Sequence, residues 1–100
     1  MRKHTIGAGL TNEEYENLHC SLKKRNQSMT EYGLMKLANV LKTGAIINKR
    51  HRNGKVAHVI TLRVSDFVYQ EVLDFIQVQG CKKTDLVAAL FQELFENGQD

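Results

Sequence analysis

The sequence has no proline, no long apolar run and only two cysteines, and each shortage narrows the class of protein. The absence of proline, with an ordinary apolar share of 42%, argues against wholesale disorder. The longest apolar run falls far short of the roughly 20 residues that a membrane span requires. No apolar segment follows the basic start of the chain as a secretory signal would, so we expect a cytoplasmic protein without a membrane partner.

Metal and disulfide chemistry find little support. Cys20 and Cys81 lie 61 positions apart with no CxxC motif, so free thiols are expected in a cytoplasmic chain. No two histidines have the close spacing of a helical or finger-type metal site. The histidines are His4, His19, His51 and His58. The sequence therefore predicts neither a metal nor another cofactor.

Enzymatic motifs are also missing. The pair Gly7-x-Gly9 lacks the third glycine of a dinucleotide-binding loop, because position 12 is Asn. No Ser/His/Asp or Cys/His grouping can be assembled from spacing alone. We expect a protein that is not an enzyme.

Charge is unevenly distributed along the chain. Residues 1–44 carry a net charge of +3 and residues 45–57 carry +4, whereas residues 58–100 carry −4. The overall net charge is +3, which alone is only modest support for a nucleic-acid partner. The concentration of positive charge in residues 1–57 is more informative, and its meaning depends on the internal repeat described below.

The segment His58–Ser65 has the alternation of a half-buried strand, with Ile60, Leu62 and Val64 on one side. A single short strand is not stable alone. The only candidate partner is residues 5–10, which alternate weakly through Ile6. We therefore predict that these two segments pair.

The two halves of the chain match at an offset of 54 residues without a gap. Each copy predicts a strand, a helix, a short turn and a second helix, with Thr30 and Thr84 expected to cap the second helices. One copy is too small for a stable core, so two copies are expected to share one. The matched pairs are His4 with His58, Ile6 with Ile60, Leu10 with Val64, Thr11 with Ser65, Tyr15 with Tyr69, Leu18 with Val72, Leu22 with Ile76, Asn26 with Gly80, Leu37 with Phe91, Leu41 with Phe95 and Gly44 with Gly98.

The repeat predicts a first unit at residues 1–44, a basic linker at residues 45–57 and a second unit at residues 58–100, all in a single domain. The linker contains the turn dipeptide at residues 53–54. Two interpretations of its charge stay open: a solvated linker, or an arm that contacts DNA phosphates. The residues concerned are Lys49, Arg50, Arg52 and Lys55.

The unit resembles the ribbon-helix-helix (Arc/MetJ-like) family in residues 60–65 and 80–86. Residues 10–15 and 28–32 look like the start of MobC/NikA-type plasmid mobilisation proteins, and two copies in one chain are similar to TraY-type conjugation proteins. The resemblance implies a mainly α fold with a short antiparallel ribbon over a shared helical core. It also implies that the ribbon enters the major groove of DNA and that the two copies pair within one chain.

The alternation would turn one face of this ribbon toward the bases. Arg63 can bond guanine bidentately, Thr61 can donate or accept, and Val59 can touch a thymine methyl. The first strand departs from the family pattern because two of its outer residues are glycines. The glycines leave three interpretations open: asymmetric readout, close approach of the backbone to DNA, or a loose edge strand. The expected base-contacting residues are Thr5, Gly7, Gly9, Val59, Thr61 and Arg63.

Phosphates would be held at the start of each second helix, where backbone N–H groups are unpaired and the helix dipole is positive. Tyr15 and Tyr69 are expected in the core rather than as base-stacking platforms. The expected phosphate contacts are Ser28, Met29, Thr30, Lys82, Lys83 and Thr84.

The sequence thus predicts a sequence-specific double-stranded DNA-binding protein of a mobile element. It would act as a relaxosome accessory factor in conjugation, as a transcriptional repressor, or as both. A relaxase or another transfer protein is a candidate partner, and further self-association on DNA is a second expectation. The alternative is an antitoxin-type module whose helices chiefly bind a protein.

Overall fold

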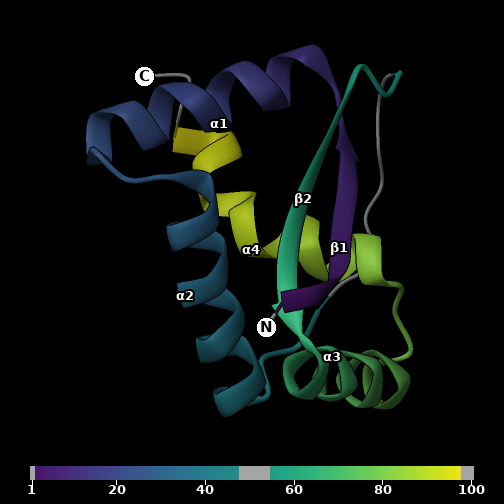
Figure 1. Cartoon of the computed structure of the whole chain (residues 1–100). Coiled ribbons are helices and arrows are strands. Elements are labelled where there is room, and N and C mark those ends of the chain that lie inside the picture. The colour runs from purple at the N-terminus through teal and green to yellow at the C-terminus, as the bar shows by residue number, and fades with distance from the viewer. Residues whose placement is uncertain (1, 48–54, 98–100) are drawn as a thin grey trace.

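In its described residues the chain forms two strands and four helices, in the order strand, helix, helix in each half (Figure 1). The computed structural model describes residues 2–47 and 55–97, and the side chains of residues 4–47 and 55–95. The fold is mainly helical with a two-stranded antiparallel sheet, as predicted, and is compatible with a ribbon-helix-helix arrangement. The elements are β1 (Arg2–Leu10), α1 (Asn12–Arg25), α2 (Met29–Thr43), β2 (His58–Ser65), α3 (Asp66–Gln79) and α4 (Lys83–Asn97).

The two strands pair antiparallel along their length, with Ile6 opposite Leu62 and Ala8 opposite Ile60. β2 has the predicted bounds, whereas β1 begins at Arg2 rather than at residue 5. The added residues do not alternate between apolar and polar side chains, so the sequence pattern did not predict them. The strand register shifts between Arg2 and His4. The residues on one face of this ribbon are almost fully buried, at 0–3% exposure. They are Ile6, Ala8, Leu10, Ile60, Leu62 and Val64.

The first helix of each half is capped at its start by a hydroxyl. Thr11 and Glu14 form a capping box on α1, with the Thr11 Oγ1 accepting from the Glu14 N–H at 3.2 Å. The Ser65 hydroxyl likewise accepts from the Val68 N–H at the start of α3. Left-handed residues end three helices, because that conformation satisfies the last carbonyls. They are Asn26, Gly44 and Gly80.

The predicted caps of the second helices are wrong. The N-cap of α2 is Ser28, whose hydroxyl accepts a backbone N–H, and Thr30 lies one residue inside the helix start. Thr84 lies at the same place in α4, where the Lys82 N–H donates instead to the Asp85 carboxylate at 3.0 Å. The Ser28 hydroxyl and the Asp85 carboxylate already accept backbone N–H groups at these two helix starts, so neither threonine is needed as a cap.

α4 is the central helix of the core and passes behind the ribbon (Figure 1). It packs closely on α1 and β1, whereas α2 touches its neighbours more lightly. α2 buries only Tyr32, Gly33 and Leu37. No helix in the described ranges is both long and apolar enough to span a membrane. The buried residues of α4 are Leu86, Val87, Ala88, Leu90, Phe91, Leu94 and Phe95.

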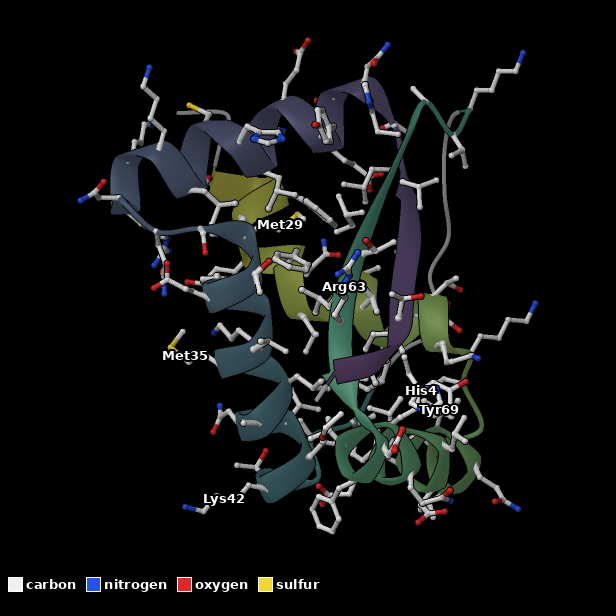
Figure 2. The ribbon with its side chains drawn as sticks, in the orientation of Figure 1. His4, Met29, Met35, Lys42, Arg63 and Tyr69 are labelled. Atoms are coloured by element: carbon white, nitrogen blue, oxygen red, sulfur yellow. The ribbon has the colours of Figure 1, made fainter. Side chains whose placement is uncertain are left out.

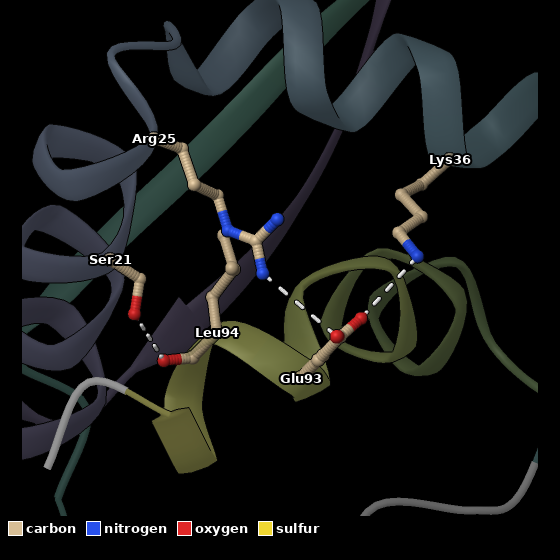
Figure 3. Close-up of polar contacts among 5 residues, drawn as sticks. All are labelled: Ser21, Arg25, Lys36, Glu93 and Leu94. Carbon is tan, nitrogen blue, oxygen red and sulfur yellow. Dashed lines mark hydrogen bonds and ion pairs between the residues drawn. The ribbon is translucent and has the colours of Figure 1, made fainter. Parts of the chain in front are cut away.

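Polar contacts tie both α1 and α2 to α4 (Figure 3). The Ser21 hydroxyl of α1 donates to the Leu94 carbonyl at 3.1 Å, in a site where Ser21 is 5% exposed. Glu93 of α4 lies 3.9 Å from Arg25 at the end of α1 and 3.5 Å from Lys36 of α2. The buried contact fixes α1 on α4, and the exposed ion pairs join α2 to α4 at the surface.

Candidate nucleic-acid interface

The outer face of the ribbon is open, because α4 covers only the inner face (Figure 1). The side chains on this face are exposed, and that of Val59 reaches 68%. The strand alternation that the sequence predicted is therefore confirmed. The outer residues face one another in three cross-strand pairs: Thr5 with Arg63, Gly7 with Thr61 and Gly9 with Val59.

Arg63 is the only charged side chain among these six residues. It is exposed, extends from the outer side of β2 (Figure 2), and makes no hydrogen bond or ion pair with any other residue in the described ranges. Its neighbour along the face, Thr61, offers a hydroxyl, and Val59 offers two methyl groups. Together they provide the donor, acceptor and apolar groups that base edges in the major groove can distinguish.

Gly7 has a structural reason to be glycine. A Cβ at this position would lie 2.6 Å from the Ile60 carbonyl oxygen and 3.2 Å from Thr61 Cγ2. The first contact is with backbone and cannot be relieved by a rotamer change, so close pairing of β1 with β2 requires glycine here. The glycine also leaves the outer face of β1 flat beside the Thr61 side chain.

The starts of α2 and α4 lie on opposite sides of the ribbon (Figure 1). At α2, the Ser28 hydroxyl accepts from the Glu31 N–H at 3.1 Å, while Met29 is half-buried and Thr30 is exposed. The first N–H groups of a helix have no partner within it, and the helix dipole favours an anion there. The α2 start thus has backbone groups that suit a phosphate, and the phosphate contact of residues 28–30 stays a prediction.

The α4 start differs from the α2 start. The Asp85 carboxylate accepts the Lys82 N–H and places negative charge at this terminus. The Lys83 ammonium donates to the Tyr69 hydroxyl at 3.1 Å and lies 5.3 Å from the centre of that ring. Lys82 and Thr84 are exposed. Lys82 is the more exposed cation at this end, while Lys83 is oriented toward Tyr69 but keeps its charge and two further N–H donors, so both predicted phosphate contacts stay predictions.

Two histidine–tyrosine stacks were not predicted. The His4 ring stacks on Tyr69 at 4.2 Å, and the His58 ring stacks on Tyr15 at 3.9 Å. The histidines also bond Asp66 and Asn12, respectively, at 2.7 and 2.9 Å. Every member of one set lies 54 positions from its counterpart, so the repeat contained the signal. Each stack joins a strand of one half to the first helix of the other half.

The tyrosines of these stacks are half-buried against the core, so their rings are not free platforms for bases. In the basic linker, Lys55 is exposed, and Lys49, Arg50 and Arg52 lie outside the described residues. Contact of the linker with DNA thus stays a prediction.

Both cysteines are free, as predicted. Burial, with a smaller contribution from the Asp85 charge, raises the pKa of the Cys81 thiol. Cys81 is therefore held in its protonated, less reactive form at neutral pH. Within the part of the chain that the structure describes, no group of three or more metal-binding side chains occurs.

Comparison of the chain with models of protein families, with curated proteins and with solved structures gives no match. What the chain does is therefore inferred from its own ribbon, helix starts and charge.

Proposed function

We propose that this chain is a sequence-specific double-stranded DNA-binding protein that inserts the β1–β2 ribbon into the major groove. The observation that carries the proposal is the outer face of the ribbon. It is uncovered, and it presents Arg63, Thr61 and Val59 beside a flat stretch of β1. A two-stranded ribbon fits the major groove, where every base pair has a distinct pattern of donors, acceptors and methyl groups.

Phosphate contacts on either side of the ribbon would set its position on the duplex. The α2 start supplies unpaired N–H groups beside Ser28, and the α4 start supplies the Lys82 ammonium. Contacts of this kind orient a protein without reading sequence. Because one side uses backbone and the other a lysine, and because β1 has glycine where β2 has Thr61, the preferred site is expected to deviate from a palindrome.

The two halves would act as two ribbon-helix-helix units paired within one chain. The stacks of His4 on Tyr69 and of His58 on Tyr15 favour this interpretation, since each crosses from one half to the other at corresponding positions. β1 and β2 also pair antiparallel, as two strands related by a twofold axis perpendicular to them do. The two halves differ in their second helices, since α2 packs on its neighbours more lightly than α4 does.

The resemblance to mobilisation and conjugation proteins favours a role at a transfer origin, as an accessory to a relaxase, or at a promoter as a repressor. Footprinting on the intergenic DNA of the element that encodes the chain separates the two. Protection beside a nick region would support the transfer role, and protection over a promoter would support repression.

The direct test is selection of a preferred duplex from random sequences, followed by titration of Arg63→Ala against it. We expect the variant to lose about 1–3 kcal/mol of specific binding and to relax preference at one base pair. Binding is measured by fluorescence anisotropy at two salt concentrations, because phosphate contacts dominate affinity and are screened.

Lys82→Ala is the matched comparison. It is expected to lower affinity equally on all duplexes and to flatten the salt dependence, with base preference retained. Lys23→Ala, at the far end of α1, controls for loss of one positive charge. Unchanged base preference in Arg63→Ala, or altered preference in Lys82→Ala, would overturn the proposed docking of the ribbon.

A further inference from the structure

A groove separates α2 from α3 beside the end of β2. Its volume is about 540 Å³, and its floor is apolar. It continues into a second hollow of about 400 Å³, and the two share Leu41 and Glu71 in their linings. The apolar residues of the larger part are Leu34, Leu37, Ala38, Leu41, Val64 and Val68.

The groove has the length of a short helix. Along α3 its lining runs from Val68 to Gln79, which at 1.5 Å per residue is about 16 Å, or three helical turns. Its far end is marked by Val78, which is 86% exposed and therefore still presents apolar surface to water. A groove of these dimensions suits the apolar face of an amphipathic helix, whose apolar side chains recur at helical spacing and can dock along the groove.

The rim of the groove on the α3 side is acidic. Asp66, Glu71 and Asp74 are the only charged residues of α3, which has no Lys or Arg. Glu71 and Asp74 line the groove and are exposed, and Glu71 makes no hydrogen bond or ion pair with another described residue. The middle of the groove thus presents two carboxylates above an apolar floor.

Two cations also line the groove, but both are displaced from this middle part. Lys42 of α2 extends away from α3 (Figure 2). Arg63 lies at the end of the groove nearest the ribbon, on the outer side of β2. The charge that an occupant meets along α3 is therefore negative.

We propose that the α2–α3 groove binds a basic amphipathic helix of about three turns from a partner protein. Leucine-like side chains would fill the floor between Leu37 and Val68, and lysine or arginine side chains would pair with Glu71 and Asp74. The proposed partner site lies along α2 and α3 and shares Arg63 with the outer face of the ribbon, so peptide binding is measured without DNA and DNA binding without peptide to separate the two proposals.

The other side of the molecule provides a template for this binding mode. There, α1 packs on α4 closely, and the Asn17 side chain donates to the Phe95 carbonyl at 2.9 Å across the contact. The corresponding position in α3 is Glu71, whose carboxylate can only accept. It cannot bond the α2 carbonyls, but it can accept from a cationic side chain on an incoming helix.

The test uses a synthetic three-turn peptide of leucine and lysine with one apolar face, and a matched peptide with glutamate in place of lysine. Binding to the full chain is followed by isothermal calorimetry without DNA. We expect one lysine peptide per chain and at least about tenfold weaker binding of the glutamate peptide, since each tenfold step needs only about 1.4 kcal/mol. Equal binding of both peptides overturns the assigned charge of the partner.

Variants locate the site. Glu71→Gln with Asp74→Asn is expected to weaken the lysine peptide at least about fivefold, and Ala38→Trp is expected to block the floor. Glu16→Gln with Glu31→Gln removes the same charge elsewhere, and Gln92→Trp places the same ring on the corresponding exposed position of α4. If either control weakens binding as much as its test variant, the groove is not the site.

Sedimentation of the chain alone decides between a partner and a second copy. The basic end of α1, residues 23–25, gives the chain a cationic helix of its own. A dimer that dissociates when Glu71 and Asp74 are neutralised would mean that a second copy fills the groove, which overturns the proposal. A monomer that binds the lysine peptide supports it.

Discussion

The two sides of this molecule pair equivalent helices in different ways. On one side α4 closes on α1 along a buried contact, while on the other side α2 stands off α3 and leaves the groove open. The apolar positions are similar in both halves, since Leu37 and Leu41 correspond to Phe91 and Phe95. A repeated apolar pattern therefore does not by itself produce repeated packing.

Two donors on α1 account for part of the difference. Asn17 and Ser21 donate to the Phe95 and Leu94 carbonyls near the end of α4. The residues 54 positions later in α3 are glutamate and phenylalanine, which have no hydrogen-bond donor to offer at neutral pH. In the other half the tie lies just beyond the end of α2, where the Gln79 side chain at the end of α3 donates to the Ala45 carbonyl and accepts from the Ile47 N–H.

A glycine accounts for a second part. A Cβ on Gly33 of α2 would lie 2.8 Å from the Leu62 side chain and 2.8 Å from the Phe91 ring, whereas α4 has the fully buried Val87 at the corresponding position. α2 thus lies close against β2 and α4 at Gly33, near its start. The groove is lined by later residues of α2, from Leu34 to Lys42.

The largest expected effect compares two leucines. Leu94→Ala, in the buried α1–α4 contact, is expected to lower the free energy of unfolding by about 3–5 kcal/mol, because it leaves an enclosed cavity. Leu41→Ala, on the groove, should cost only about 1 kcal/mol, since it widens a space that water already reaches. Urea denaturation measures both.

The same chemical change at two helix ends makes each leucine the control of the other. Similar losses in the two variants would mean that the groove closes in solution, and the comparison of the two sides would fail.

Gly33→Val tests the close approach of α2. The branched side chain meets Leu62 and Phe91, so the variant is expected to lose about 1–3 kcal/mol through overpacking. Ala38→Val places the same side chain on the groove side of α2 and should cost only a few tenths, mostly from helix propensity. Thermal unfolding of both variants is compared; a Gly33→Val protein as stable as Ala38→Val would contradict the assigned contact.

The sequence predicted the ribbon well because its signals are local. The alternation of His58–Ser65 specifies a buried face, and Thr11 and Ser65 provide hydroxyls where helices start. The repeat added the pairing of β1 with β2. Even so, the extension of β1 to Arg2 had no apolar pattern, and Ser28 competed with Thr30 for one cap.

The groove and the contact of Lys83 with Tyr69 could not be predicted in the same way, because both depend on contacts between residues distant in the sequence. Lys83 is drawn to Tyr69 by a hydrogen bond that only the packing of α3 on α4 makes possible. The groove reflects which polar groups meet across helices, and spacing along the chain does not contain that information. Readout of DNA by Arg63 stays a prediction for the binding experiments.

A smaller effect is expected for Ser21→Ala. Removal of the hydroxyl leaves the Leu94 carbonyl without this donor in a buried site, at a cost of about 1 kcal/mol. Cys20→Ala, at the adjacent exposed position of α1, should change stability little. If Ser21→Ala unfolds at the same urea concentration as Cys20→Ala, the hydrogen bond does not explain the tighter side.

The smallest effect concerns the exposed ion pairs that join α2 to α4. Glu93→Gln removes the partner of both Arg25 and Lys36, and we expect a loss of about 0.2–1 kcal/mol at low salt, because exposed pairs are weak. High salt should abolish the difference from the parent chain. Glu71→Gln, which makes the same change on the groove rim, should leave stability unchanged or slightly raised, since that carboxylate has no cationic partner among the described residues. A loss in Glu93→Gln that persists in high salt would mean that Glu93 acts through packing rather than charge, and α2 would then be held on α4 more firmly than its open side implies.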